Sequence, residues 1–294
     1  MKTNELKGHL CALACILVWG TTFISSKILL KIFNPMELLF MRFLIGFMAI
    51  CIASPKVLKL KNKKEEIWYA LCGLTGVCLY YFLENLALTY TYATNVGVII
   101  SAAPFFTTIL AHFLYKDEPF QWNFFVGFIV AFIGIFLISF NGAKMQLNPL
   151  GDLITVIAAF MWAIYSVILK KINNLGHSSL QNTKRIFAWG LFFMLFGLFF
   201  FDFKISMQQV LQPTILINLL FLGVIACAGC FVVWNYACQI LGSVRCNQYV
   251  YGTPIATLIF SSIVLKEKIT LLIALGTILT LLGLIISEYK QKGS

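Results

Sequence analysis

Glu84 lies deep inside an apolar stretch of the sequence, where a carboxylate is costly unless it faces a cavity or a cation. A carboxylate in this setting is suited to bind a cationic substrate group or a coupling proton. The structural alternative is that Lys27 or Arg42 neutralises it, or that a neighbouring helix hydrogen-bonds to it. We expect Glu84 to bind substrate or a proton.

Aromatic and small polar residues recur at helical spacing in several apolar stretches and predict a cavity around this carboxylate. An apolar cavity with a few polar groups is the usual form of a small-molecule site. For each aromatic residue the alternative is packing, and for each buried amide it is an interhelical hydrogen bond. The candidate substrate-binding residues are Trp19, Thr22, Phe23, Tyr80, Glu84, Asn85, Trp162, Tyr165, Trp234, Asn235 and Tyr249.

We expect a second group of residues, which includes Glu84, to act in gating or in coupling. Arg42 and Arg185 occupy matching positions near the ends of their apolar stretches, which predicts alternating ion pairs or anchors at the membrane surface. Lys27 is interpreted in the same way, with binding of a substrate carboxylate as a further option. Pro104 and Pro254 lie inside apolar stretches and predict either hinges or static bends.

Signatures of enzymes and metal sites are missing from the sequence. It contains no P-loop, no G-x-S-x-G and no H-E-x-x-H. Cys227 and Cys230 form a C-x-x-C, but no second pair or His lies near them, so buried apolar cysteines are expected. We therefore expect no metal, no cofactor and no enzymatic activity; an intramembrane enzyme acting on lipids is the remote alternative.

Composition identifies the elements that must position these residues. Of the 294 residues, 60% are hydrophobic and 11% are charged, which excludes soluble, disordered and collagen-like chains. A bilayer core about 30 Å thick takes about 20 apolar residues per helix. The sequence therefore predicts an all-α integral membrane protein with ten transmembrane helices. The expected spans are 8–31, 35–53, 67–90, 93–115, 120–140, 150–171, 182–202, 213–239, 244–265 and 269–288.

The net charge of +11 is interpreted by its location and not as a sign of nucleic-acid binding. When ten spans alternate across the bilayer, most Lys and Arg residues fall in loops on the side of the N-terminus. Because such loops are cytoplasmic, both termini are expected in the cytoplasm.

The sequence also contains an internal repeat. Rare residue types recur at matching positions in the two halves, among them Trp19 with Trp162 and Asn85 with Asn235. Five spans is an odd number, so the second half must enter the membrane from the opposite side. The predicted units are 1–146 and 147–294, an inverted repeat typical of secondary transporters.

These features resemble the drug/metabolite transporter superfamily, EamA-type branch. The resemblance rests on the Trp19-Gly20 and Arg42-Phe43 pairs, the YFLENLALTYT stretch at 81–91, Ala103-Pro104, and the acidic loops at 116–119 and 266–267. It implies a central cavity lined by spans one, three, four, six, eight and nine. One difference is that Cys246-Asn247-Gln248 stands where the first half has Val96-Gly97-Val98, so the halves are not equivalent.

The resemblance implies a bacterial inner-membrane transporter related to exporters of aromatic amino acids and other metabolites. We expect export of amino acids or related small metabolites by alternating access around a site at the membrane midplane, with protons as a possible coupling ion. Efflux of organic cations and uptake of a metabolite are the alternatives. The expected partners are the small substrate and the lipid bilayer, with no nucleic acid, and a monomer suffices.

Overall fold

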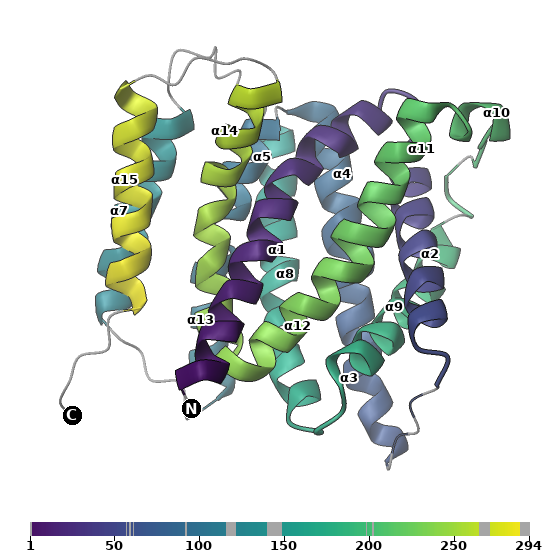
Figure 1. Ribbon diagram of the computed structural model, residues 1–294, viewed down its shortest axis with the longest axis horizontal. Helices are drawn as coiled ribbons and strands as arrows, with labels where there is room; N and C mark the ends of the chain where they lie inside the picture. The colour runs from purple at the N-terminus through teal and green to yellow at the C-terminus, as the bar shows by residue number, and fades with distance from the viewer. Residues whose placement is uncertain are drawn as a thin grey trace.

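A computed structural model describes residues 2–56, 58, 60, 62–91, 93–115, 122–139, 149–197, 199–201, 203–264 and 271–288. All regular elements of these residues are helical (Figure 1). The loops at 116–119 and 266–267 lie outside the described residues. The helices of the first half are α1 (Lys2–Leu29), α2 (Pro35–Ala53), η1 (Lys63–Glu65), α3 (Glu66–Cys72), η2 (Gly73–Leu79), α4 (Tyr80–Tyr90), α5 (Ala93–Ile100), α6 (Ala103–Leu114) and α7 (Trp122–Ser139). Those of the second half are α8 (Pro149–Asn173), α9 (Ser179–Gly197), α10 (Met207–Val210), α11 (Pro213–Leu220), η3 (Phe221–Gly229), α12 (Cys230–Leu241), α13 (Ser243–Asn247), η4 (Gln248–Gly252), α14 (Thr253–Val264) and α15 (Leu271–Glu288).

The long apolar stretches form helices because apolar helices satisfy every backbone group internally in a bilayer. Within the described residues, six helical stretches are long and apolar enough to cross a membrane, and two shorter apolar helices accompany them. The chain is therefore a multi-pass membrane protein. The expected arrangement of ten spans stays a prediction.

Proline marks where several helices begin. Pro35 is the first residue of α2, and Asn34 caps that helix by accepting hydrogen bonds from the backbone N–H groups of Met36 and Glu37. The Glu37 side chain bonds back to the Asn34 N–H at 2.8 Å, which completes a capping box. A missing N–H does no harm at the first helical position, so proline fits there.

Two of the expected spans are broken in the middle. The helix of α5 ends at Ile100, and α6 begins at Ala103 with Pro104 as its second residue. In the second half, a short 3₁₀ segment (η4) precedes α14, whose second residue is Pro254. The two prolines therefore start new helical segments. They do not bend a continuous helix.

Wide π-helical turns interrupt two long spans at matching places, η2 before α4 and η3 before α12. The absence of a side chain at Gly76 in η2 lets the ring of Tyr165 on α8 lie directly against the backbone. A Cβ at Gly73 would lie 2.7 Å from the Gly190 nitrogen on α9. These segments therefore bring α8 and α9 close to the first half of the chain.

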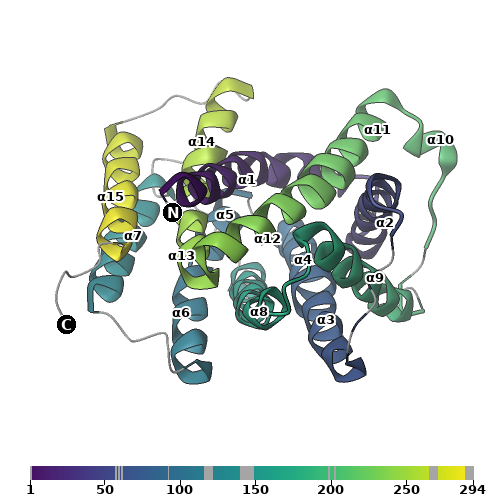
Figure 2. The same cartoon turned by 60° about the horizontal axis from the view of Figure 1, so that its bottom comes forward.

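Helix α8 lies at the centre of the bundle, with α3, α4, α5, α6 and α12 packed against it (Figure 2). At one edge of the molecule, α7 and α15 run side by side (Figure 1). Glycines at their contact allow the close approach: a Cβ at Gly127 would lie 2.6 Å from the Gly283 carbonyl, and one at Gly134 2.5 Å from that of Gly276. Small residues at a helix–helix contact permit this close approach of the two backbones.

Replacement of Gly134 by Ala is expected to destabilise this pair of helices. The new methyl group would lie 2.5 Å from the Gly276 carbonyl oxygen and the Thr280 nitrogen and 2.6 Å from Thr280 Oγ1, so α7 and α15 must separate. Overpacking of this kind costs about 1–3 kcal/mol. The measurement is thermal unfolding of the detergent-solubilised protein.

Gly97→Ala is the matched control. Its added methyl group would meet Phe23 at an ordinary 3.7 Å, and helical Gly→Ala changes otherwise stabilise by about 0.5–1 kcal/mol. Equal melting temperatures for the two variants would contradict the assignment of a tight contact to Gly134.

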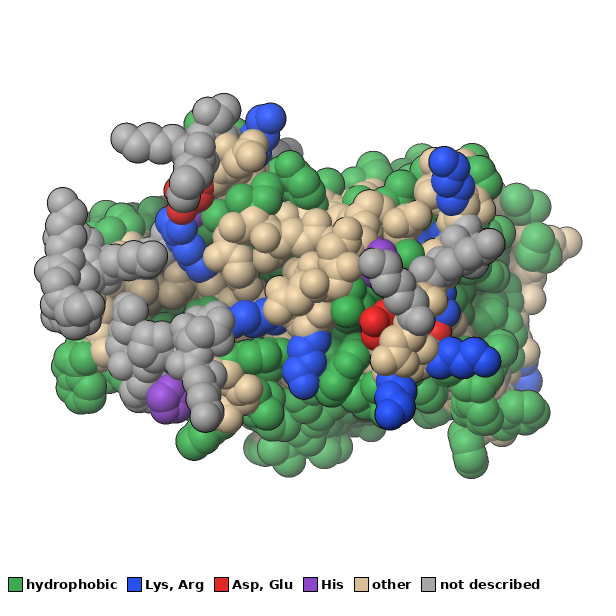
Figure 3. Space-filling view, turned by 90° about the horizontal axis from the view of Figure 1, so that it is seen from below, with side chains coloured by type: hydrophobic (Ala, Val, Ile, Leu, Met, Phe, Trp, Pro, Cys, Tyr) green, Lys and Arg blue, Asp and Glu red, His purple; other side chains and the backbone are tan. Residues whose placement is uncertain are grey.

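Charge is concentrated on one face of the molecule. Helix α1 begins and α15 ends on this side, at the bottom of Figure 1. Figure 3 shows Lys and Arg side chains spread across it. We call it the basic face. Among its described basic residues are Lys7, Lys56, Lys63, Lys64, Lys171, Lys184, Arg185 and Arg245.

Candidate functional site

A small cavity of about 30 Å³ lies among α1, α4, α5, α8 and the broken η4–α14 segment. Six of the predicted substrate-binding residues line it: Trp19, Thr22, Phe23, Tyr80, Glu84 and Trp162. Thus residues from both halves of the sequence meet at one place. One water needs about 10–15 Å³ of such space, so the cavity has room for a water or two and not for a metabolite.

Indole and phenol rings form most of the wall. The Trp19 and Trp162 rings meet edge to face at 5.5 Å, and Trp19 lies 5.0 Å from Trp234. The Trp19 Nε1–H donates to the carbonyl of Ala226 at 3.0 Å, a group inside the π-helical η3. The Trp162 Nε1–H donates to Asn247 Oδ1 at 2.8 Å. Both rings are therefore held in fixed orientations.

Glu84 is 2% exposed and lines the cavity from α4. Its Oε1 has no hydrogen-bond partner among the described residues. A buried carboxylate oxygen without a partner is costly. The position therefore has spare capacity to accept hydrogen bonds from a proton donor or a cationic ligand.

Arg42 of α2 is fully buried beside the same cavity. Its guanidinium lies 4.5 Å from the ring centroid of Tyr81, itself a lining residue, and its Nε donates to the Cys227 sulfur at 3.2 Å. Arg42 and Glu84 carry opposite charges, and both are buried in this region of the bundle. Neither terminal nitrogen of Arg42 has a hydrogen-bond partner in the described part of the chain.

This placement differs from a surface anchor, one of the two roles expected for Arg42. Its side chain is enclosed by protein, and its terminal N–H groups have no partner among the described residues. Glu84 lines the cavity, and Arg42 lies against Tyr81 of the cavity wall, so two opposite charges are buried at the aromatic lining.

Three predicted residues form a layer behind the cavity. The Tyr165 hydroxyl donates to Asn235 Oδ1 at 2.6 Å, and Asn235 Nδ2 donates to Thr183 Oγ1 at 2.9 Å. Trp234 is fully buried against Trp19, and its Nε1–H has no partner among the described residues. The contacts of Tyr165 and Asn235 tie α8, α9 and α12 together, which favours the interhelical role for Asn235.

Asn85 and Tyr249 lie away from the cavity. The Asn85 side-chain nitrogen donates to the Pro35 carbonyl at the start of α2, at 3.2 Å. The Tyr249 hydroxyl is 2.6 Å from His9 Nδ1, near the basic end of α1. The structure therefore does not bring these two residues together with Glu84.

The expected gating residues are distributed along the length of the molecule. Lys27 donates to the Thr91 carbonyl at 3.0 Å, at the end of α1 opposite the basic face. Arg185 forms a bidentate ion pair with Glu66 on the basic face. Each links two different helices at one end of the bundle.

Five residues around the cavity were not among the predicted site residues. Tyr81 lines it from α4. Asn247 orients Trp162, and Ile100, Val250 and Thr253 also line the cavity. These three flank the breaks before Pro104 and Pro254, so the prolines were the sequence feature that marked their place. Asn247 belongs to the segment that differs between the halves.

Comparison with known proteins identifies relatives across the whole chain. The model of the EamA-like transporter family matches residues 6–140 and 149–289. A protein of Archaeoglobus fulgidus, named as an uncharacterized transporter, is 30% identical over 291 residues, covering 97% of this chain and 98% of that protein. The probable amino-acid metabolite efflux pump of Escherichia coli is 26% identical over 302 residues, covering 96% of this chain and 95% of that protein.

One solved crystal structure superposes with a TM-score of 0.75 at 16% sequence identity. The match covers 95% of this chain and 97% of that one, which shows a shared fold. No group of three or more potential metal-ligating His, Cys, Asp or Glu side chains is present in the described ranges.

Proposed function

Because this chain belongs to the EamA-like transporter family, we propose that it is a secondary transporter for amino acids or closely related zwitterionic metabolites. The observation that carries the proposal is the burial of two opposite charges at one aromatic cavity, Glu84 in its lining and Arg42 against Tyr81 of its wall. A zwitterion offers one ammonium and one carboxylate, which match the free carboxylate oxygen and the free guanidinium N–H groups. The Trp19, Trp162 and Tyr80 rings provide the apolar wall for a side chain.

The buried Arg42 argues against the main alternative, an organic cation as the substrate. An organic cation would be attracted by Glu84, but Arg42 would remain unpaired beside it and repel the ligand. A zwitterion leaves neither charge uncompensated, so it fits the described site better.

Alternating access is supported by the small volume of the cavity and by matching discontinuities in the two halves. The cavity of about 30 Å³ is smaller than a metabolite, so substrate entry requires helices around it to move. The family model matches once in each half. The π-helical turns and the breaks before Pro104 and Pro254 also occur in pairs. We place the repeats at 1–146 and 147–294.

The proposed orientation has the basic face in the cytoplasm, and with it both termini. The proposed location is a bacterial inner membrane, with a monomer as the working unit and protons as the coupling ion. The name of the E. coli relative favours export as the direction. Uptake in the same orientation is the competing direction.

Counterflow in proteoliposomes tests the substrate class. Liposomes are loaded with one unlabelled amino acid from a panel, and entry of the labelled compound is followed. Saturable exchange of at least one zwitterion is expected, with no exchange of the matching decarboxylated amine. Exchange of amines alone would replace the proposal with cation efflux, and conductance without saturation would replace it with a channel.

A further inference from the structure

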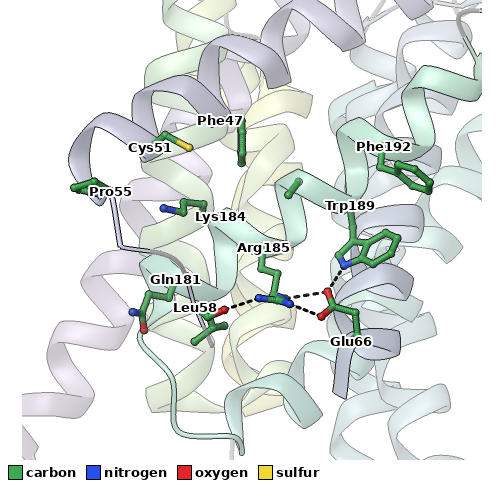
Figure 4. A pocket seen from close by; sticks show the side chains of 11 residues that line it. Phe47, Cys51, Pro55, Leu58, Glu66, Gln181, Lys184, Arg185, Trp189 and Phe192 are labelled. Atoms are coloured by element: carbon green, nitrogen blue, oxygen red, sulfur yellow. Dashed lines mark hydrogen bonds and ion pairs between the residues drawn. The ribbon is translucent and has the colours of Figure 1, made fainter. Parts of the chain in front are cut away.

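A large groove of about 680 Å³ opens at the basic face, separate from the central cavity (Figure 4). It lies between the end of α2, the chain that follows α2, the start of α3, and α9. Three charged residues line it, Glu66, Lys184 and Arg185. The remaining wall is largely apolar.

The polar end of this groove is positively charged. Arg185 is held by Glu66 and also donates to the Leu58 carbonyl at 2.7 Å. Lys184 donates to the carbonyls of Ser54 and Lys56 at 2.6 and 2.9 Å. An ammonium has three N–H donors, so one donor of Lys184 remains for a ligand. The two cations face one carboxylate, which leaves the groove with a net positive charge.

The apolar end extends along two helices toward the membrane interior. Phe192 lies two turns beyond Arg185 on α9, a distance of about 10 Å along the helix axis. The Phe192 side chain is 46% exposed. Phe47 and Cys51 form the facing wall on α2. Exposed Ile52 and Phe192 flank the groove, and in a membrane protein such apolar surface contacts lipid. The groove is therefore charged at the membrane surface and apolar below it.

We propose that this groove is a binding site for an anionic phospholipid of the leaflet at the basic face. A phosphate headgroup contacts Lys184, and the upper part of an acyl chain lies between Phe47 and Phe192. Lys56, Lys63 and Lys64 stand on the same face beside the groove and add to its positive field. Basic clusters next to a transmembrane helix attract anionic lipids by about 1 kcal/mol per residue.

Native mass spectrometry of lipid binding to the delipidated, full-length protein tests the site. Phosphatidylglycerol and phosphatidylcholine with identical acyl chains separate the headgroup charge from the apolar contact, and soluble glycerol phosphate probes the headgroup alone. Phosphatidylglycerol is expected to bind at least fivefold more tightly than phosphatidylcholine. Glycerol phosphate is expected to bind far more weakly than either lipid.

Two variants and one control locate the binding. Lys184→Gln is expected to weaken the binding of phosphatidylglycerol about fivefold, which is the effect of one surface cation. Ala188→Trp fills the groove from an exposed position without a change of charge. This variant should weaken the binding of both lipids. Lys7→Gln removes an exposed charge from α1 on the same face and should leave binding unchanged.

Each contrary result overturns the proposal. Equal binding of the two lipids would remove the role of the phosphate. Equal losses in Lys184→Gln and Lys7→Gln would show a general surface charge effect, and an unaffected Ala188→Trp would place the lipid elsewhere. Glycerol phosphate binding as tightly as the lipid would make this a site for a free phosphate.

Discussion

Glu84→Gln is expected to reduce amino-acid counterflow by a factor of about 30 or more while leaving the protein folded. Loss of one partner from a buried charge pair costs about 2–5 kcal/mol, and each 1.4 kcal/mol is tenfold in affinity. In this site the lost partner is the carboxylate that receives the substrate ammonium. The measurement is the saturation curve of exchange in proteoliposomes.

Two opposing terms set the thermal stability of Glu84→Gln. The Glu84 carboxylate is 2% exposed with one oxygen unbonded among the described residues, so its charge is costly in the empty protein. A neutral amide of the same shape removes that cost, but it also leaves the buried Arg42 without its counter-charge, which destabilises the fold. Weaker exchange together with an equal or higher melting temperature separates a functional carboxylate from a structural one.

The pH dependence of exchange supplies a further check on the coupling role. If Glu84 carries the coupling proton, the exchange rate of the wild-type protein changes with pH and that of Glu84→Gln does not. Glu5→Gln is the control, because Glu5 is an exposed carboxylate in an ion pair with Arg245 at the basic face. Full exchange with unchanged pH dependence in Glu84→Gln would exclude the carboxylate from both roles.

The sequence was informative about the cavity because burying a charge or an amide in lipid is expensive. That cost singled out Glu84, and helical spacing around it selected Trp19, Thr22 and Tyr80, which the structure places on one cavity. Gly127 and Gly134 on α7, and Gly276 and Gly283 on α15, form a comparable short-range pattern, since glycines permit close backbone approach. Both arguments use short-range patterns within a single helix.

The sequence was less informative where partners come from distant segments. Asn85 and Asn235 look identical in their repeats, yet one bonds to a helix start and the other to the Tyr165 hydroxyl. Tyr249 follows a broken segment whose path no periodicity describes, and the structure places it beside His9. The kind of residue was predictable at these positions, whereas the contact depended on the packing of several helices.

Arg42 and Arg185 illustrate the same limit, and their difference leads to a prediction. They are repeat-related residues, but Arg185 donates three hydrogen bonds, to Glu66 and to the Leu58 carbonyl, at the basic face. Both terminal nitrogens of Arg42, beside Tyr81 of the cavity wall, lack a hydrogen-bond partner among the described residues. The two arginines are therefore expected to differ in function.

Arg42→Gln is expected to remove the preference for zwitterions over amines. Amino-acid exchange should fall about 30-fold or more, because the substrate carboxylate loses its bidentate partner. The decarboxylated amine should compete better in the variant than in the wild-type protein, since Glu84 stays and the repelling cation is gone. Arg42→Lys should also lose the preference for zwitterions, because an ammonium cannot reproduce the planar set of donors of a guanidinium.

Arg185→Gln is the matched control for this experiment. Loss of its ion pair weakens the contact between α3 and α9, so stability and overall exchange rate can fall, but amino acid and amine must be affected by the same factor. A changed amino-acid to amine ratio in Arg42→Gln with a constant ratio in Arg185→Gln places carboxylate recognition at Arg42. If both ratios stay constant, Arg42 serves only to balance the charge of Glu84, and the ligand is recognised by that carboxylate and the aromatic wall alone.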